Sequence, residues 1–279
     1  MSNECVNELE NGKSFSEIVE AMAIRFLPRF VTYSPNVSLL IDTEKYQLKT
    51  ASHVEELINV FRLRYQNFLE AVKGDEATYD LDEFDHLCDH LVIIDKSTQQ
   101  IIGTYRILCS DFTSKFYSAT EFKIDEFLKI PGKKIELGRA CIDPHYRNGQ
   151  VIDLLWKGIA EYHYATGAKY MFGCSSVKTQ SPQVALGIYN YLEARGNALR
   201  EYNIEPLPKF KMDFSGCTQE SAIEVKNFIP GLLRSYLTAG AKIIGEGAID
   251  RDFECVDFFT LINIEEISPL FKKRYFNKE

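Results

Sequence analysis

The sequence of 279 residues predicts an α+β fold in which helices cover both faces of a mixed, mostly antiparallel sheet. From Tyr46 onward, amphipathic helical segments alternate with short β-type runs. The β runs 90–95 and 101–109 are separated by the polar turn KSTQQ, which predicts an antiparallel hairpin. Helical segments follow the β runs 134–142 and 169–174, as in crossover connections. Hairpins together with crossovers indicate a three-layer α/β/α arrangement.

The composition excludes several classes of protein. The chain is 45% hydrophobic and 26% charged, which is typical of a soluble globular protein. Its net charge of −8 argues against nucleic acid as a partner. Its 7 cysteines are far apart and form no CxxC pair, so we expect reduced thiols and no metal site. No apolar run is long enough to span a membrane and the N-terminus is polar, so we expect a cytoplasmic protein.

The first half of the chain begins with residues 1–44, which we expect to form a polar tail and a short helix near 18–27. Residues 46–51 read as a strand. Residues 53–72 place eight apolar side chains on one helical face: Val54, Leu57, Ile58, Phe61, Tyr65, Phe68, Leu69 and Val72. An acidic loop, DEATYDLDEFDH, precedes the hairpin. No G-x-G-x-x-G, Walker, G-x-S-x-G or H-E-x-x-H motif is present, which argues against the commonest dehydrogenases, NTPases, serine hydrolases and zinc proteases.

The second half continues the alternation. Ser181 is expected to cap a helix that starts at Pro182 and is closed by Gly196. The other expected elements, in chain order, are a strand at 134–142, a helix at 151–166, a strand at 169–174, a polar connection at 203–227, a helix at 230–239 and strands at 241–249 and 255–264.

Six motifs follow one another in this order: FRLRYQNF, DLDEFD, IIGTYRIL, ELGRACI, YRNG and VIDLLWKGI. Together they resemble the GNAT-type N-acyltransferases, and more narrowly the acyl-carrier-protein-dependent branch. That branch includes ornithine-lipid-forming enzymes, N-acyl amino acid synthases and, more distantly, acyl-homoserine-lactone synthases. The C-terminal stretch from FIPGLLRSYL to INIE is similar to the ornithine group. The resemblance covers residues 45–276 and implies a GNAT-like core at 45–200 with a C-terminal α/β extension at 201–279.

The turn before the second helix of that core bears on the acyl donor. Coenzyme-A-dependent members of the resembling family carry a glycine-rich turn, because bare backbone N–H groups must approach a pyrophosphate. Here Asn148, Gln150 and Ile152 stand at the glycine places. This favours the phosphopantetheine thioester of an acyl carrier protein as the co-substrate, and we expect no other cofactor. The alternative is that the turn only begins a helix and binds nothing. The resemblance implies that the pantetheine arm contacts Cys141, Ile142, Arg147, Asn148, Gly149 and Val151.

Basic residues near this turn are candidates for docking an acidic carrier protein. They are Lys129, Lys133, Lys134, Arg147 and Lys157. The alternative is an ordinary solvated charged surface.

Glu136 is the candidate general base, with Arg139 beside it in the catalytic region. An acceptor amine with a pKa of about 8 or more is mostly protonated at neutral pH, and a partly desolvated carboxylate can take its proton. The alternative is an ion pair between the two residues. Regular strand alternation would place them on opposite faces, and Gly138 between them would allow a bulge that re-aims one side chain.

Four further charged residues are candidates for binding the amino-acid acceptor: Arg64, Asp82, Asp85 and Arg106. Asp82 and Asp85 would hold an ammonium group, or would instead form structural ion pairs with Arg64. Arg106 and Arg139 would bind the carboxylate. Cys141 is close in sequence to Glu136, but the resemblance gives no nearby histidine a role in activating it and buried cysteines are usually inert, so we expect direct attack of the amine on the thioester.

The resemblance implies transfer of a long-chain, 3-hydroxy acyl group to the α-amine of ornithine. The C-terminal extension, with three aspartates after AKIIGEGA, exceeds what a lactone-forming synthase needs. The alternatives are acylation of glycine or another amino acid, a homoserine-lactone-like signal synthase, a non-catalytic module that binds acyl carrier protein, and a coenzyme-A-dependent acetyltransferase. The basic, aromatic end FKKRYFNK is a candidate for peripheral contact with the inner membrane.

Overall fold

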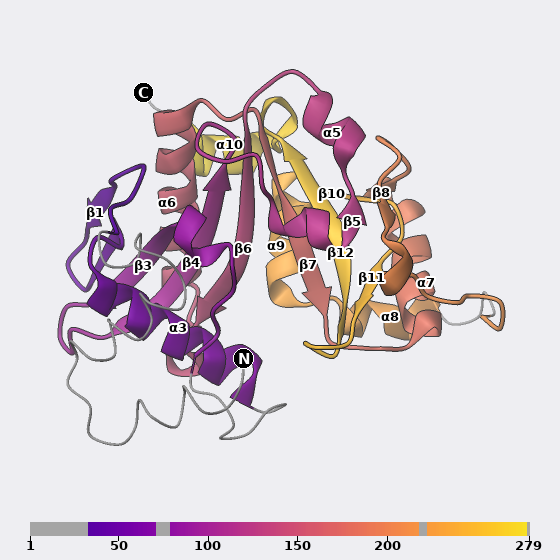
Figure 1. Cartoon of the computed structure of the whole chain (residues 1–279), viewed down its shortest axis with the longest axis horizontal. Helices are drawn as coiled ribbons and strands as arrows, with labels where there is room; N and C mark the ends of the chain where they lie inside the picture. Colours follow the sequence, from indigo (N-terminus) through magenta and orange to yellow (C-terminus); the bar gives the residue numbers. More distant parts are fainter. Residues whose placement is uncertain (1–32, 71–78, 218–221, 278–279) are drawn as a thin grey trace. The chain divides into compact units, whose positions relative to one another are not determined.

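The computed structural model describes residues 33–70, 79–217 and 222–277 (Figure 1). These residues form two compact units. Unit 1 holds the described residues up to Leu108 together with Gly138–Thr166, and unit 2 holds Cys109–Leu137 and the residues from Gly167 onward. The boundary falls inside strand β6 (Lys134–Ile142), which therefore contributes to both units. The short helix expected near 18–27 lies outside the described residues.

Unit 1 contains the strand order β1-β2-β3-β4-β6. Its first four strands pair antiparallel, so the predicted hairpin is confirmed as β3 and β4. Their bounds are β1 (Leu40–Asp42), β2 (Tyr46–Thr50), β3 (Asp89–Asp95) and β4 (Ile101–Cys109). Two short 3-10 helices also belong to this unit: η2 (Asp85–Leu87) and η4 (Pro144–Tyr146).

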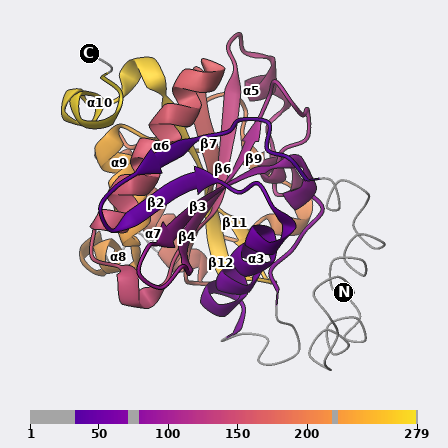
Figure 2. The ribbon, with the colours of Figure 1, turned by 90° about the vertical axis from the view of Figure 1, so that its left-hand side faces the viewer.

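Two helices cover the opposite faces of this sheet, α3 (Val54–Phe68) and α6 (Gln150–Thr166). Helix α3 shares a buried core with Val92 of β3. Helix α6 approaches so closely that a Cβ added at Gly158 would lie 3.1 Å from Leu91 Cδ1. Consecutive strand residues face opposite sides, so Leu91 and Val92 assign α6 and α3 to different faces (Figure 2). The predicted three-layer arrangement is thereby confirmed in unit 1.

Unit 2 contains the strand order β6-β7-β12-β10-β8, with β11 paired to β12, and a separate pair of β5 and β9. The β6–β7 and β8–β10 pairs are parallel and the others antiparallel, so the mixed, mostly antiparallel character is confirmed. The strands are β5 (Phe122–Lys123), β7 (Tyr170–Val177), β8 (Ala198–Leu199), β9 (Glu205–Pro206), β10 (Lys242–Ile244), β11 (Ala248–Asp250) and β12 (Cys255–Asn263). Because β12 lies between β7 and β10, the C-terminal residues complete this sheet.

The helices of unit 2 include the one predicted at Pro182. Ser181 Oγ accepts the N–H of Val184 at 3.4 Å, as expected of its N-cap. The helices are α5 (Asp125–Lys129), α7 (Pro182–Glu193), α8 (Ala222–Phe228), α9 (Gly231–Ala239) and α10 (Pro269–Tyr275), with 3-10 helices η3 (Tyr117–Thr120), η5 (Pro208–Phe210) and η6 (Ile264–Glu266). Phe127 packs against Phe172 and Phe259 with ring centroids 5.1 and 5.6 Å away. This aromatic cluster forms part of the unit's core.

Two expectations for the C-terminal third were wrong in detail. The strand expected at 241–249 is divided into β10 and β11, because Gly245 between them has φ +74°. A Cβ there would lie 2.3 Å from Ile204 O, so only glycine fits this turn. Helix α8 lies within the stretch expected to be a connection. Within the described part of the chain, no helix has the length and apolar character needed to cross a bilayer.

Candidate active site

Unit 1 contains a buried group of paired charges. We call it the arginine–aspartate cluster, and it consists of Arg64, Asp80, Asp82, Asp85, Arg106 and Arg139. Arg64 of α3 donates from Nε to Asp80 Oδ2 at 2.8 Å and from Nη1 to Asp85 Oδ1 at 2.7 Å. Arg64 and Asp85 are fully buried and form the ion pair that was one of the two alternatives for these residues, and contact of either residue with an acceptor stays a prediction.

The remaining members of the cluster are closer to solvent. Arg106 of β4 donates to Asp82 at 2.7 Å and to Asp85 at 3.2 Å. Arg139 of β6 donates to Asp80 at 3.0 Å and to Asp82 at 3.2 Å. The side chains of Asp82 and Arg139 keep 22% and 13% exposure. The sequence predicted that four residues of this cluster contact the acceptor amino acid. Asp82 and Arg139 are the members of the cluster most accessible from solvent.

The electrostatics of the cluster follow from its pairing. Burial alone would raise the pKa of Asp85, but the guanidinium groups of Arg64 and Arg106 hold that pKa well below its ordinary value. Burial lowers the pKa of the neighbouring His90 to about 4, so its imidazole is neutral at physiological pH. The cluster pairs three aspartates with three arginines, so its formal charges balance.

Strand β6 departs from regular geometry where the sequence predicted it. Arg139 has φ +51°, in the left-handed region that a residue with a side chain rarely adopts. The strain turns the Arg139 side chain toward Asp80 and Asp82, and the two ion pairs offset its cost. The expected change of direction thus lies at Arg139, next to the glycine in sequence.

Glu136, the predicted base, lies in the part of β6 that belongs to unit 2. Its carboxylate accepts the backbone N–H groups of Tyr117 and Ser118, each at 2.6 Å, and the Ser118 hydroxyl at 2.5 Å. Only 4% of the residue is exposed. The start of η3 therefore fixes the orientation of this carboxylate. Its role as a base stays a prediction, and no local pattern in the sequence indicates its partners in η3.

The turn at 147–151 leads into α6 in unit 1. Arg147 donates to Asn67 Oδ1 at 2.8 Å and to Ile142 O at 3.1 Å. Asn148 Oδ1 accepts the N–H of Gln150 at 3.1 Å, and Gly149 has φ +87° with open space around it. The first helical N–H groups are thus partly satisfied by the turn's own side chain.

Two residues expected to touch the pantetheine arm have buried side chains. Val151 is fully buried and lies 3.1 Å from a Cβ added at Gly103, so its side chain belongs to the core of unit 1. The thiol of Cys141 is buried, points toward Leu63 O at 3.7 Å, and burial raises its pKa to about 12. Contact at these two positions would use backbone atoms. The Cys141 thiol is too basic to be a nucleophile at neutral pH.

The expected basic docking surface loses one member. Lys134 is 4% exposed and donates to Ile130 O and Gly132 O, and burial lowers its pKa. It was wrongly included, because a strand residue that reads as charged surface here packs over the Phe127 ring at 5.5 Å. Lys133 is paired with Asp111 on the surface.

Comparison with known proteins shows the family. Residues 63–157 match the family model of the acetyltransferase (GNAT) domain. The chain is 32% identical over 248 residues to an L-ornithine N(alpha)-acyltransferase of Rhizobium meliloti (strain 1021), a match that covers 82% of this chain and 83% of the relative. It is 33% identical over 234 residues to the enzyme of that name from Brucella abortus (strain 2308), covering 76% and 82%. The chain belongs to the L-ornithine N(alpha)-acyltransferase family. The resemblance predicted from the motifs is confirmed.

Solved structures with related folds were also found. One is an N-acyl amino acid synthase from uncultured soil microbes, 10% identical, with a TM-score of 0.47 over 80% of this chain and 94% of that chain. Another is the loading GNATL domain of CurA from Lyngbya majuscula, 14% identical, with a TM-score of 0.46 over 79% and 98%. The chain matches the GNAT family model, and helices lie on both faces of the sheet in unit 1. Both observations support a GNAT-type acyltransferase fold.

Proposed function

We propose that the protein transfers a long-chain, 3-hydroxy acyl group from the thioester of an acyl carrier protein to the α-amine of ornithine. The amine nitrogen attacks the thioester carbonyl carbon, a C–N bond forms, the C–S bond breaks, and the carrier's thiol leaves with a proton. The observation that supports the ornithine acceptor is membership in a family whose relatives, aligned over 76–82% of this chain, are named L-ornithine N(alpha)-acyltransferases. The acyl group and its carrier-protein donor are our inference from the sequence.

Direct attack is favoured over an acyl-enzyme intermediate. Besides Cys141, the candidate thiol near the predicted base is Cys174, whose Sγ lies 3.5 Å from Ser118 Oγ. Burial raises the pKa of Cys174 well above its ordinary value, so it also stays protonated at neutral pH. A protonated, buried thiol is a poor nucleophile. The amine itself is the better nucleophile once it is neutral.

Glu136 is the group proposed to make the amine neutral. A carboxylate held by three donors has a fixed direction and can take a proton directly or through one water molecule. No metal ion takes part in this proposal.

An acceptor panel tests the proposed function. The purified protein is incubated with a 3-hydroxyacyl carrier protein and ornithine, lysine or glycine, and the products are read by mass. We expect N-acyl ornithine with the highest kcat/KM. Glycine that equals or exceeds ornithine would contradict the acceptor assignment, and a lactone product would indicate a signal synthase. The absence of any acylated amine would favour a non-catalytic carrier-binding module.

The turn at 147–151 predicts the donor. Asn148 Oδ1 already accepts the N–H of Gln150, where an N-terminal helix amide would otherwise bind a phosphate oxygen. We therefore expect kcat/KM for the acyl carrier protein to exceed that for the matching acyl-coenzyme A by about tenfold or more, because about 1.4 kcal/mol of lost binding corresponds to a factor of ten.

Asn148→Gly is the matched variant for the donor prediction. It frees the Gln150 N–H and removes the side chain without touching the core of unit 1. Coenzyme A use should rise while carrier-protein use stays within about twofold, an amount well under the roughly tenfold that 1.4 kcal/mol represents. Equal use of the two donors by the unmodified protein would show that the turn does not select between them.

The C-terminal helix α10 supports a peripheral membrane contact. Leu270 is 79% exposed, and Lys272, Lys273 and Arg274 follow it on the surface. Each basic residue near an anionic bilayer contributes about 1 kcal/mol, so Lys272→Gln with Lys273→Gln should weaken binding to anionic vesicles about tenfold or more. Flotation with anionic and neutral vesicles measures this. Binding that survives high salt, or that is equal on neutral vesicles, would contradict the electrostatic contact.

A further inference from the structure

Unit 2 contains a cavity of about 560 Å³ whose function the sequence did not suggest. Its walls come from η3, the segment around η5 and the turn that follows β11. Six of its lining residues matter here: Tyr117, Glu121, Lys209, Phe210, Asp250 and Phe253. The mixture of aromatic rings and carboxylates is the usual lining of a site for a small polar ligand.

Glu121 is the unusual residue of this cavity. It is 1% exposed, and neither of its carboxylate oxygens makes a hydrogen bond within 3.5 Å among the described residues, although the side chains of Tyr117 and Asp257 lie close enough to influence it. Burial, and then the nearby negative charges of Asp257 and Asp250, raise the pKa of Glu121 to about 9. A buried acceptor without a donor costs stability unless a ligand supplies the donor.

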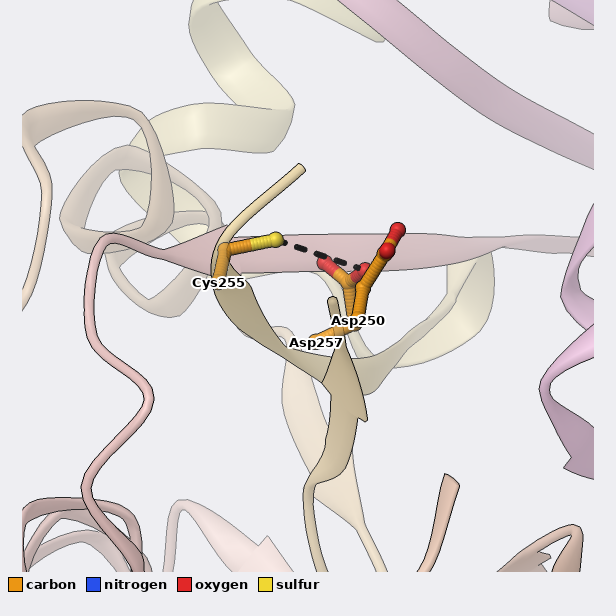
Figure 3. Close-up of side chains that lie close together, drawn as sticks. All are labelled: Asp250, Cys255 and Asp257. Atoms are coloured by element: carbon orange, nitrogen blue, oxygen red, sulfur yellow. Dashed lines mark hydrogen bonds between the residues drawn. The ribbon is translucent and has the colours of Figure 1, made fainter. Parts of the chain in front are cut away.

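Two more carboxylates surround Glu121. Asp250 of β11 and Asp257 of β12 are 6% and 3% exposed, and their oxygens and the Cys255 thiol all lie within 4.8 Å of one another. Figure 3 shows the Cys255 thiol directed toward Asp257, with the side chain of Asp250 beside that of Asp257. Asp250 Oδ1 accepts the N–H groups of Asp252 and Phe253, and its other oxygen makes no hydrogen bond with the described residues.

This negative charge differs from that of the arginine–aspartate cluster. There, each aspartate accepts from at least one arginine. Around Glu121, the hydroxyl of Ser176 donates to Asp257 Oδ1 at 2.5 Å, and Lys209 is the cation among the lining residues. The Lys209 ammonium lies 5.0 Å from the centroid of the Phe210 ring, at the exposed side of the cavity. The charged side chains that line the cavity are therefore mainly acidic, with Lys209 as the lining cation.

We propose that this cavity binds the side-chain ammonium of the dibasic acceptor, with Glu121 and Asp250 as the groups that contact it and Lys209 as the partner of its carboxylate. The inference rests on the proposed function and adds the residues that select a dibasic amino acid over a neutral one. An ammonium group donates three hydrogen bonds, which matches the unpartnered oxygens of Glu121 and the second oxygen of Asp250.

The cavity also adjoins the predicted base. Tyr117 lines the cavity, and its backbone N–H donates to Glu136 Oε2 at 2.6 Å. Ser118, the next residue of η3, donates to the other oxygen of Glu136 and lies 3.5 Å from Cys174 Sγ. Glu136 and Glu121 are thus held by the same short helical turn and its end. One acceptor molecule with its reacting amine near Glu136 would direct its side chain toward Glu121.

An organic cation suits the cavity better than a metal ion. The volume is far larger than a single ion occupies, and three aromatic side chains line it. Burial raises the pKa of the Cys255 thiol, and its Sγ points to Asp257 Oδ2 at 3.8 Å. A protonated thiol is a weak ligand for a divalent cation, because a metal requires the thiolate.

The test compares ornithine with norvaline, which has the same carbon chain without the side-chain amine. Thermal melting of the donor-free protein should rise with ornithine and not with norvaline. The free Glu121 carboxyl, with its pKa of about 9, is protonated at neutral pH, and a bound ammonium would favour its ionised form. In turnover with acyl carrier protein, Glu121→Gln and Asp250→Asn should each raise KM for ornithine about 10- to 100-fold, because each variant removes a carboxylate that accepts from the bound ammonium. KM for norvaline should change less than about threefold, a shift well within one factor of ten.

Controls separate binding from folding. Glu121→Gln should leave the melting temperature unchanged or higher, because the carboxyl it removes has no partner to lose. Glu265→Gln makes the same chemical change at a surface ion pair with Lys169 and should leave both KM values unchanged. These controls use the full-length chain.

The outcomes distinguish this inference from the proposed function. Acylation of ornithine by the unmodified protein tests the function, whatever the variants do. An ornithine preference that persists in Glu121→Gln and Asp250→Asn would overturn the cavity as its origin, and so would an unmodified protein that does not distinguish ornithine from norvaline. Stabilisation by Zn²⁺ or Mg²⁺ that both variants abolish, with no effect of ornithine, would overturn it in favour of a metal site.

Discussion

Replacing Asp85 with asparagine is expected to lower the free energy of unfolding by about 3–5 kcal/mol. Asp85 is fully buried and accepts from Arg64 at 2.7 Å and from Arg106 at 3.2 Å. Asparagine keeps the shape but removes the charge, so the buried guanidinium of Arg64 would lose half of its compensation. Urea unfolding of the variant measures the effect, and Asp42→Asn is the matched control, because Asp42 forms an exposed pair with Lys96.

A double replacement sharpens this prediction. Arg64→Met with Asp85→Leu removes one positive and one negative charge together and leaves Arg106–Asp82 and Arg139–Asp80 as pairs. The double variant should be more stable than Asp85→Asn alone, because a buried pair replaced by apolar groups costs little. If Asp85→Asn unfolds like the unmodified protein, the cluster does not depend on its central pair.

Acid should reveal the same interaction. The pKa of Asp85 in the folded protein lies below its unfolded value of 3.8, despite burial, because Arg64 and Arg106 favour the ionised form. Its contribution is therefore present above that value and is lost as the pH falls below it. The stability difference between the unmodified protein and Asp85→Asn should shrink below about pH 4, where the unfolded carboxyl takes up a proton.

Local sequence patterns predicted the helices and strands whose position depends mainly on their own residues. The period of apolar residues marked α3 and α6, and Ser181 with Pro182 marked the start of α7. The pairing of Arg64 with Asp85 was among the open alternatives, since a guanidinium beside an apolar stripe needs a carboxylate. Asp80 was missed, because three aspartates spaced through DLDEFD read equally as solvated loop.

Features that depend on distant residues left no local signal. Glu121 stands between a threonine and a phenylalanine, and the carboxylates that raise its pKa lie in β11 and β12, far along the chain. Lys134 read as surface charge, but its ammonium lies 5.5 Å from the centroid of the Tyr170 ring in β7, which covers it. Gly245 interrupts a continuous apolar pattern only because Ile204 O lies against it. Tertiary neighbours decide each of these cases.

Replacing Glu136 with glutamine is expected to reduce turnover by about 10²–10⁴, the usual contribution of a positioned acid–base group. The amide cannot accept the proton of the attacking amine. It also brings an NH₂ group against donors at Tyr117 N, Ser118 N and Ser118 Oγ, so at least one hydrogen bond is lost. An unsatisfied buried donor costs about 1–3 kcal/mol of stability, so activity must be compared at a temperature where both proteins are folded.

The Ser118→Ala variant distinguishes the proposed role of Glu136 as a base from the effect of the hydrogen bond that orients its carboxylate. It removes the hydroxyl that donates to Glu136 at 2.5 Å and keeps the carboxylate and both backbone donors. If Glu136 is the base, Ser118→Ala should retain most of the turnover and the acid limb of the pH–rate profile, whereas Glu136→Gln should lose both. Equal losses in the two variants, or a Glu136→Gln enzyme with near-normal turnover and an unchanged pH profile, would show that Glu136 only anchors η3 and that the amine loses its proton to another group.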